Sequence, residues 1–262
     1  MFGRRSPLPV PARLIKRLPM AVIDLANPTR FLTLVNRVLP WLAAATVLLF
    51  AFGLARAMNA PDDYQQGATV KIMFLHVPAA WLSMMGWGLM SIAALGTLVW
   101  RHPLADVAGK AAAPIGAAFT FICLVTGSLW GRPTWGTYWV WDARLTSVLV
   151  LFLLYLGVLA LYWTAEDPGR GSRAAAVLTL VGAVNIPIIK FSVDWWNTLH
   201  QPASILRMGG SAIDPSILWP LLIMAVAFTL LFFALHLAAM RNEILRRRVR
   251  SMRIIQAQEV RA

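Results

Sequence analysis

Two histidines and a tryptophan-rich stretch carry side chains that could together hold a large planar ligand. Residues 135–146 read WGTYWVWDARLT and follow Trp130, so that four tryptophans fall within a dozen residues. His76 and His200 stand beside aromatic residues in two other segments of the chain. A buried indole needs a partner for its N–H, and an exposed one is poorly solvated. The stretch therefore indicates either a belt at a lipid interface or an aromatic floor for a flat ligand.

The donor set favours haem over a bare metal ion. Two neutral imidazoles can serve as the axial pair of a haem iron, because the porphyrin supplies the other four ligands. The only cysteine is Cys123, which we interpret as a small apolar residue, and no C-x-x-C pair is present for zinc or covalent haem. Anionic propionates would pair with cations on the same side, for which the candidates are Arg132, Arg144, Lys190 and Arg207. Each of these could instead reach lipid head groups or pair with Asp142 or Asp194.

The elements that position these residues are expected to be membrane-spanning helices. The chain is 59% hydrophobic and only 13% charged, whereas soluble domains carry roughly 25% charged residues. A helix in lipid satisfies its own backbone polar groups, and about 20 apolar residues cross the hydrocarbon. We therefore predict an all-α polytopic protein with one six-helix domain. The expected spans are Val38–Met58, Val77–Trp100, Ala111–Trp130, Leu145–Trp163, Ala174–Val193 and Ile217–Met240.

Charge distribution predicts the orientation. The formal net charge is +13, and Lys and Arg gather at both ends of the chain and in the second and fourth connections. Basic loops stay in the cytoplasm, so both termini are expected there and the tryptophan-rich loop outside. This pattern favours contact with anionic lipid over nucleic acid. The chain then divides into a basic N-terminal segment 1–37, a transmembrane domain 38–240 and a basic tail 241–262. Asn27 before Pro28 is typical of a helix start, so the first helix should begin before Val38.

Three other functions compete with ligand holding. A permease subunit for a small metabolite needs polar residues along its path, but these are sparse within the spans. A purely structural subunit would carry an interface belt at both faces, whereas the Trp-rich stretch is one-sided. An oxidoreductase would need a second, inner haem to conduct electrons across the membrane. His102 and His236 fall near the cytoplasmic ends of their spans, and we interpret both as structural.

The Trp-rich stretch resembles the WWD signature of haem-handling membrane proteins. The segments LHVPAAW at 75–81 and WWNTLHQP at 195–202 are similar to the flanking histidine segments of one branch, the haem exporter protein C (CcmC) family. The resemblance runs from the first span to the sixth. Tyr138 departs from it, since paired tryptophans often stand there, but tyrosine keeps an aromatic plane.

The resemblance implies a role, a cargo and partners. Members of this family hold haem b in transit at the periplasmic face of the bacterial inner membrane and present it to the haem chaperone CcmE. The small subunit CcmD and the ATP-binding-cassette subunits CcmA and CcmB complete the complex, so ATP hydrolysis is expected in partners and this chain is not expected to be an enzyme. The axial-ligand role would fall to His76 and His200. The haem platform would comprise Trp130, Trp135, Trp139, Trp141, Asp142 and Arg144.

Overall fold

The computed structural model describes residues 27–201, 204–205 and 208–260, and this part of the chain is built from helices. The basic residues before position 27, Arg207 and Arg261 lie outside the described residues. Six segments are long and apolar enough to cross a membrane, as predicted. They are α2 (Pro28–Met58), α3 (Met73–Leu98) preceded by the 3-10 helix η2 (Ala68–Ile72), α4 (Pro103–Trp135), α5 (Ala143–Thr164), α6 (Pro168–Gly182) continued by α7 (Asn185–Trp195), and α8 (Pro215–Glu259).

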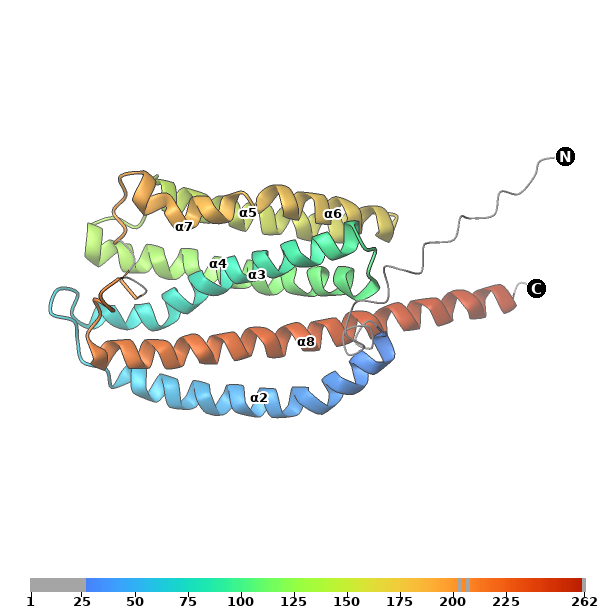
Figure 1. Ribbon diagram of the computed structural model, residues 1–262, viewed down its shortest axis with the longest axis horizontal. Helices are drawn as coiled ribbons and strands as arrows, with labels where there is room; N and C mark the ends of the chain where they lie inside the picture. The colour runs from blue at the N-terminus through green and yellow to red at the C-terminus, as the bar shows by residue number, and fades with distance from the viewer. Residues whose placement is uncertain (1–26, 202–203, 206–207, 261–262) are drawn as a thin grey trace.

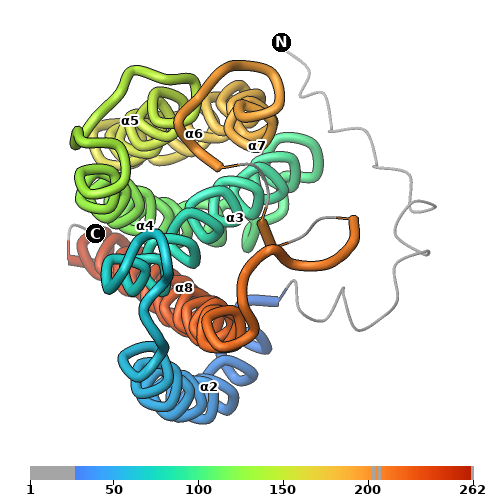
Figure 2. The backbone as a smooth tube through the Cα atoms, turned by 90° about the vertical axis from the view of Figure 1, so that its left-hand side faces the viewer, coloured from blue at the N-terminus to red at the C-terminus, as the bar shows by residue number. Residues whose placement is uncertain are grey.

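The helices run along one axis with the α3–α4 pair in the middle. α2 packs against α8, and α8 packs against α3 and α4 (Figure 1). Helices α5, α6 and α7 cover the opposite side of that pair (Figure 2). The described parts of connections 59–72, 136–142 and 196–214 meet at one end, here called the histidine end. The connections 99–102 and 165–167 meet at the other, the basic end, where α2 begins and α8 ends.

Side-chain caps fix where several helices begin. The Asn27 side chain accepts a hydrogen bond from the Thr29 amide at 2.9 Å, and Pro28 occupies the first turn, which confirms the predicted early start of α2. Asp214 caps α8 in the same way through the Ser216 amide at 2.8 Å. α8 then continues to Glu259, beyond the expected end of the sixth span at Met240, because its charged continuation is helical as well.

The fifth span is made of two helices rather than one. Pro187 has no N–H to offer the carbonyl of Ala183, one turn earlier. That carbonyl accepts a tighter bond from the Ile186 amide at 3.1 Å, and the helix is interrupted between Gly182 and Asn185. The Asn185 side chain donates to the Ser147 carbonyl of α5 at 2.8 Å. The interruption is therefore stabilised from a neighbouring helix, as is usual for proline in a membrane span.

Small residues and buried polar bonds hold the middle of the bundle. The Tyr155 hydroxyl donates to the Ser83 carbonyl at 2.8 Å, and a Cβ at Gly116 would lie 2.2 Å from its oxygen. Trp87 donates its indole N–H to the Thr179 carbonyl at 3.0 Å. Side-chain bonds of this kind link helices in lipid, where apolar burial alone gives little driving force for association.

Two exposed positions at opposite ends of the bundle should label from opposite sides of a membrane. Thr134 lies in the last turn of α4 at the histidine end, and the side chain of Arg170, at the start of α6, is 83% exposed. In a Cys123→Ala background, we expect Thr134→Cys and Arg170→Cys to react with an impermeant maleimide added to opposite faces of sealed vesicles. Labelling of both from the same face would contradict the fold.

Candidate functional site

His76 lies in the first turn of α3 and packs against α4. Its Nδ1 is 3.0 Å from the Thr126 Oγ1. Its ring packs edge-on against the Trp130 ring, with the two ring centroids 5.7 Å apart. The Thr126 hydroxyl donates its single proton to the Ile122 carbonyl at 2.6 Å. Its oxygen can therefore only accept from His76, which places the imidazole proton on Nδ1. Nε2 then carries the lone pair, and a metal would be bound there.

Gly127 provides the space in which the His76 ring lies. A Cβ at this position would be 2.8 Å from the imidazole Cε1. Such a contact is well inside van der Waals distance, so a larger residue here would displace the ring. Thr126 and Gly127 are therefore both part of the His76 environment. Sequence reasoning missed them, although Thr126 stands one helical turn before Trp130, on the same face of α4.

His200 lies in the connection between α7 and α8 and faces the start of α5. Its Nδ1 is 3.5 Å from the Asp142 Oδ2, and both atoms are buried with no closer hydrogen-bond partner among the described residues. Its ring packs edge-on against Trp135 at 4.8 Å. Burial lowers the pKa of His200 and the nearby Arg144 adds to this, while the Asp142 carboxylate raises it. The net lowering favours the neutral imidazole, which is the form that binds a metal.

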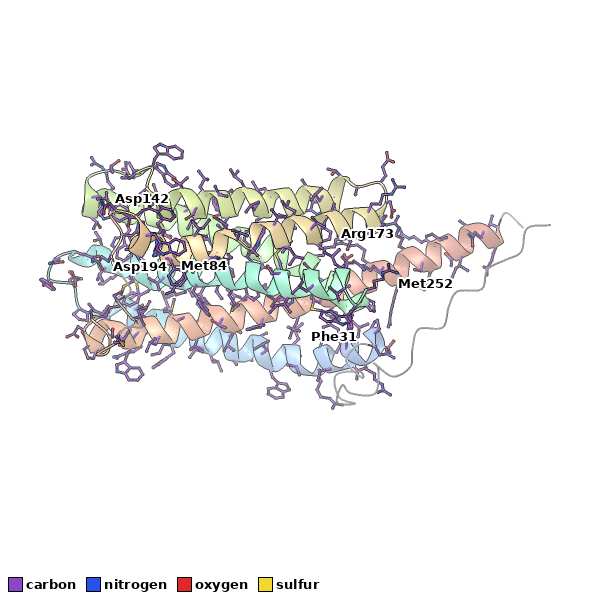
Figure 3. The ribbon with its side chains drawn as sticks, turned by 45° about the horizontal axis from the view of Figure 1, so that its top comes forward. Phe31, Met84, Asp142, Arg173, Asp194 and Met252 are labelled. Carbon is purple, nitrogen blue, oxygen red and sulfur yellow. The ribbon has the colours of Figure 1, made fainter. Side chains whose placement is uncertain are left out.

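Asp142 has two functions at one position. Its Oδ1 accepts a hydrogen bond from the Leu145 amide at 2.7 Å, which makes it the N-cap of α5. Its Oδ2 is directed at His200. A carboxylate behind a histidine orients the ring and fixes its tautomer, leaving the far nitrogen for a metal. The cap therefore couples the start of a membrane span to the orientation of an imidazole (Figure 3 labels Asp142 at this end).

The two imidazoles lie at the same end of the bundle. They are 124 positions apart in the chain, and the fold brings the first turn of α3 and the connection 196–214 to the histidine end. In the part of the chain that the structure describes, no group of three or more His, Cys, Asp or Glu could hold a metal ion. The arrangement offers two neutral nitrogen ligands in a partly buried setting. That is the number of protein ligands that a haem iron takes.

The four motif tryptophans do not share one loop or one plane. Trp130 and Trp135 belong to α4, so only Trp139 and Trp141 stand in the connection to α5. The Trp130 indole donates to the Gln66 side chain at 2.9 Å, a partner that sequence reasoning missed. Trp139 and Trp141 meet edge to face at 76°. The Trp139 Nε1 is buried without a partner among the described residues, whereas the Trp141 ring is 76% exposed.

The outer cations differ in whether their side chains bond to other described residues. Arg144 donates to the Ser192 hydroxyl at 3.1 Å and to the Lys190 carbonyl at 3.3 Å, so it ties α5 to α7. Arg132 bonds the Gly136 carbonyl and lies over the Tyr138 ring at 5.7 Å. Lys190 has an exposed side chain with no bond to another described residue. The other two histidines are elsewhere. His102 occupies the N-cap position of α4 at the basic end, without a capping bond from its side chain, and His236 is buried in α8 against Phe232.

Comparison with known proteins identifies the family. The sequence model of "Heme exporter protein C" (CcmC) matches residues 21–255. The chain belongs to this family. The Heme exporter protein C of Bradyrhizobium diazoefficiens is 77% identical over 91% of this chain and 90% of its own length. The proteins of the same name from Escherichia coli K12 and Paracoccus denitrificans are 50% and 43% identical, over 85% and 89% of this chain and 90% and 97% of their own lengths.

Family membership confirms the resemblance read from the WWD stretch and the two histidine segments. The matched region contains every residue of the site described above, and it includes the first five spans and all but the last four residues of α8. The chain is therefore a multi-pass membrane component of the haem export class.

Asp142→Asn should lower the pKa of His200 further. Asparagine caps a helix about as well as aspartate, so α5 should keep its start while the negative charge opposite His200 is lost. Because Asp142 raises the His200 pKa through charge and hydrogen bonding, its removal leaves the lowering by burial and by Arg144. The measurement is an NMR titration of the histidine Cε1–H signals, assigned with His200→Gln. Asp194→Asn, at the same end of the bundle, is the matched control and should leave the titration unchanged. An unaltered pKa in Asp142→Asn would refute the pairing.

Proposed function

We propose that this chain binds haem between His76 and His200 and delivers it to the haem chaperone CcmE during c-type cytochrome biogenesis. The observation that carries the proposal is the matched environment of the two imidazoles. Each has its Nδ1 directed at an acceptor, Thr126 for one and Asp142 for the other, which leaves both Nε2 atoms for iron. Metal-binding histidines are held by such partners in most proteins. The relatives named Heme exporter protein C support haem as the cargo.

Further features of the histidine end fit a porphyrin. The buried Trp139 Nε1 lacks a partner among the described residues, and a haem propionate is an acceptor that would satisfy it. The exposed Lys190 is a cation available to a second carboxylate. The indoles of Trp130 and Trp135 contact the two histidines and would flank the macrocycle. When bound, haem b would remain intact as cargo, and the protein would supply axial ligation, orientation and partial exclusion of water.

We place the histidine end at the periplasmic face of the bacterial inner membrane, with both termini in the cytoplasm. The basic residues at the opposite end support this orientation. Delivery requires access from outside, which a site made of connections at a membrane face allows. The assembly that we propose includes CcmD with CcmA and CcmB, and ATP would be hydrolysed in those partners rather than in this chain.

His76→Ala and His200→Ala should each alter the Soret band of the purified protein and stop c-type cytochrome maturation, because each removes one axial nitrogen. Thr126→Val should lower haem affinity about 10- to 100-fold by removing the partner of His76. The absorption spectrum and haem titration measure both effects. His102→Ala, a partly exposed histidine at the basic end, is the control and should behave as wild type. If His76→Ala and His200→Ala both load haem with an unchanged spectrum, the assignment is wrong.

Trp141→Ala should weaken capture of CcmE while the protein keeps most of its haem. Trp141 is 76% exposed, and among the described residues its ring contacts Trp139, so it is available to a partner. Trp141→Phe should be milder because an aromatic plane remains. Co-purification of the chaperone, with and without haem, measures the effect. Trp41→Ala is the matched control, since Trp41 is 78% exposed but lies in α2. Equal capture by wild type and Trp141→Ala would remove this residue from the docking surface.

A further inference from the structure

A second cleft lies at the basic end, away from the histidines. It has a volume of about 840 Å³ and opens between the ends of α3, α4, α5, α6 and α8. Figure 3 labels Arg173, which lines it, at the end opposite to Asp142 and Asp194. None of the residues that line the cleft belongs to the haem site proposed above. The position is the level at which the helices leave the apolar zone.

The inner wall of the cleft is an ion-pair network in which two carboxylates bond three cations. Lys110 and Arg247 both bond the Glu243 carboxylate at 2.9 Å, and Arg247 also bonds Asp106. Arg246 makes a longer contact with Glu243, at 3.4 Å, and the Ser172 hydroxyl donates to Asp106. These contacts join α4, α6 and α8. They use the carboxylates of Asp106 and Glu243, so neither is left to neutralise other cations.

The rim of the cleft carries three arginines with no such partner. Arg101, Arg173 and Arg250 line the cleft, are exposed, and make no ion pair or hydrogen bond with another residue that the structure describes. One further carboxylate, Glu166, lies at the same rim and is exposed. Three guanidinium groups around a concave surface present donors in the geometry that suits phosphate oxygens.

Arg101 adds a second, independent observation. Its φ is +49°, the left-handed region that favours glycine, and it is the only residue other than glycine with a positive φ among those described. An arginine there is conformationally unfavourable, and such residues cluster at sites where the side chain has a use. The side chain at this position lines the cleft.

The lateral wall of the cleft is apolar and faces where lipid would be. Leu98, Tyr162 and Trp163 line it, and the Trp163 ring is 73% exposed. Trp100, just before Arg101, is 72% exposed as well. Exposed tryptophans at a helix end mark the membrane–water interface. A ligand here would therefore have a phosphate among the arginines and acyl chains along the tryptophans, which describes a lipid rather than a soluble anion.

We propose that this cleft binds the phosphate of an anionic glycerophospholipid through Arg101, Arg173 and Arg250. Basic pockets between transmembrane helices are typical sites for such head groups. The bound lipid would bridge α3, α6 and α8, the elements that carry the three arginines or end beside them. The proposal does not depend on haem binding at the other end.

The test is native mass spectrometry of the full chain in detergent, titrated with phosphatidylglycerol or phosphatidylcholine. We expect tighter binding of phosphatidylglycerol. The triple variant Arg101→Gln, Arg173→Gln, Arg250→Gln should lose about fivefold in affinity per cation, or about a hundredfold in total. The matched control is Arg37→Gln, Arg241→Gln, Arg253→Gln, which removes the same charge from the basic-end side of α2 and α8 outside the cleft. It should retain wild-type affinity.

Three outcomes would overturn the proposal. Equal losses in the two triple variants would mean that general surface charge attracts the lipid. Equal affinity for phosphatidylglycerol and phosphatidylcholine would mean that the arginines do not select an anionic head group over a zwitterionic one. Displacement of the lipid by millimolar inorganic phosphate or glycerol 3-phosphate, with equal affinity for these compounds, would make the cleft a site for a free phosphate. Unfolding of the triple variant is checked by its helical circular dichroism signal and its elution in gel filtration. If it is unfolded, Arg101→Gly alone replaces it, because glycine accepts the positive φ.

Discussion

The close approach of α3 and α4 is the constraint on which the histidine end depends. It is possible because α4 presents glycine at the points of contact. A Cβ at Gly86 of α3 would lie 3.4 Å from the Gly116 Cα of α4. At Gly116 the missing side chain makes room for the Tyr155 ring of α5, and at Gly127 it makes room for His76 of α3. A single added methyl group would meet an atom at 2.2 Å or 2.8 Å at these two positions. In lipid, close packing of this kind and buried hydrogen bonds, rather than apolar burial, hold helices together. The position of the His76 ring is therefore a direct consequence of helix packing.

His200 is positioned by a different principle. It lies in a connection, where no helix fixes its orientation, and the Asp142 carboxylate supplies the constraint instead. Because Asp142 also caps α5, the carboxylate is itself held by a backbone amide. The two histidines thus differ in how they are held: His76 by the packing of two spans, and His200 by a contact of 3.5 Å between a cap and a loop. If both bind the cargo as proposed, release is easier when one of them can move away without disturbing the helices.

The sequence predicts those features that local chemistry determines. Hydrophobic length predicted six spans, and Asn27 with Pro28 predicted the start of α2, since a cap needs only adjacent residues. Both histidines were identified because aromatic residues flank them in the chain. Thr126 was missed because it lies 50 positions from His76, and only packing brings the two together. The length of α8 was missed because apolar character ends near Met240 while helix propensity does not. The prediction of the ligand pair as such is still to be tested.

The two ends of the bundle differ in which polar or charged groups lack a partner. The two ends therefore suit different kinds of ligand. At the histidine end the buried Trp139 indole N–H lacks a partner among the described residues, whereas the Asp142 Oδ2 and the His200 Nδ1 lie 3.5 Å from each other. An unpaired buried polar group costs about 1–3 kcal/mol, so the indole favours a ligand that accepts its hydrogen bond. At the basic end the buried carboxylates are fully paired with Lys110 and Arg247, and the unpaired groups are exposed cations. Water already solvates these, so they select a ligand by its net charge and by the shape of the cleft.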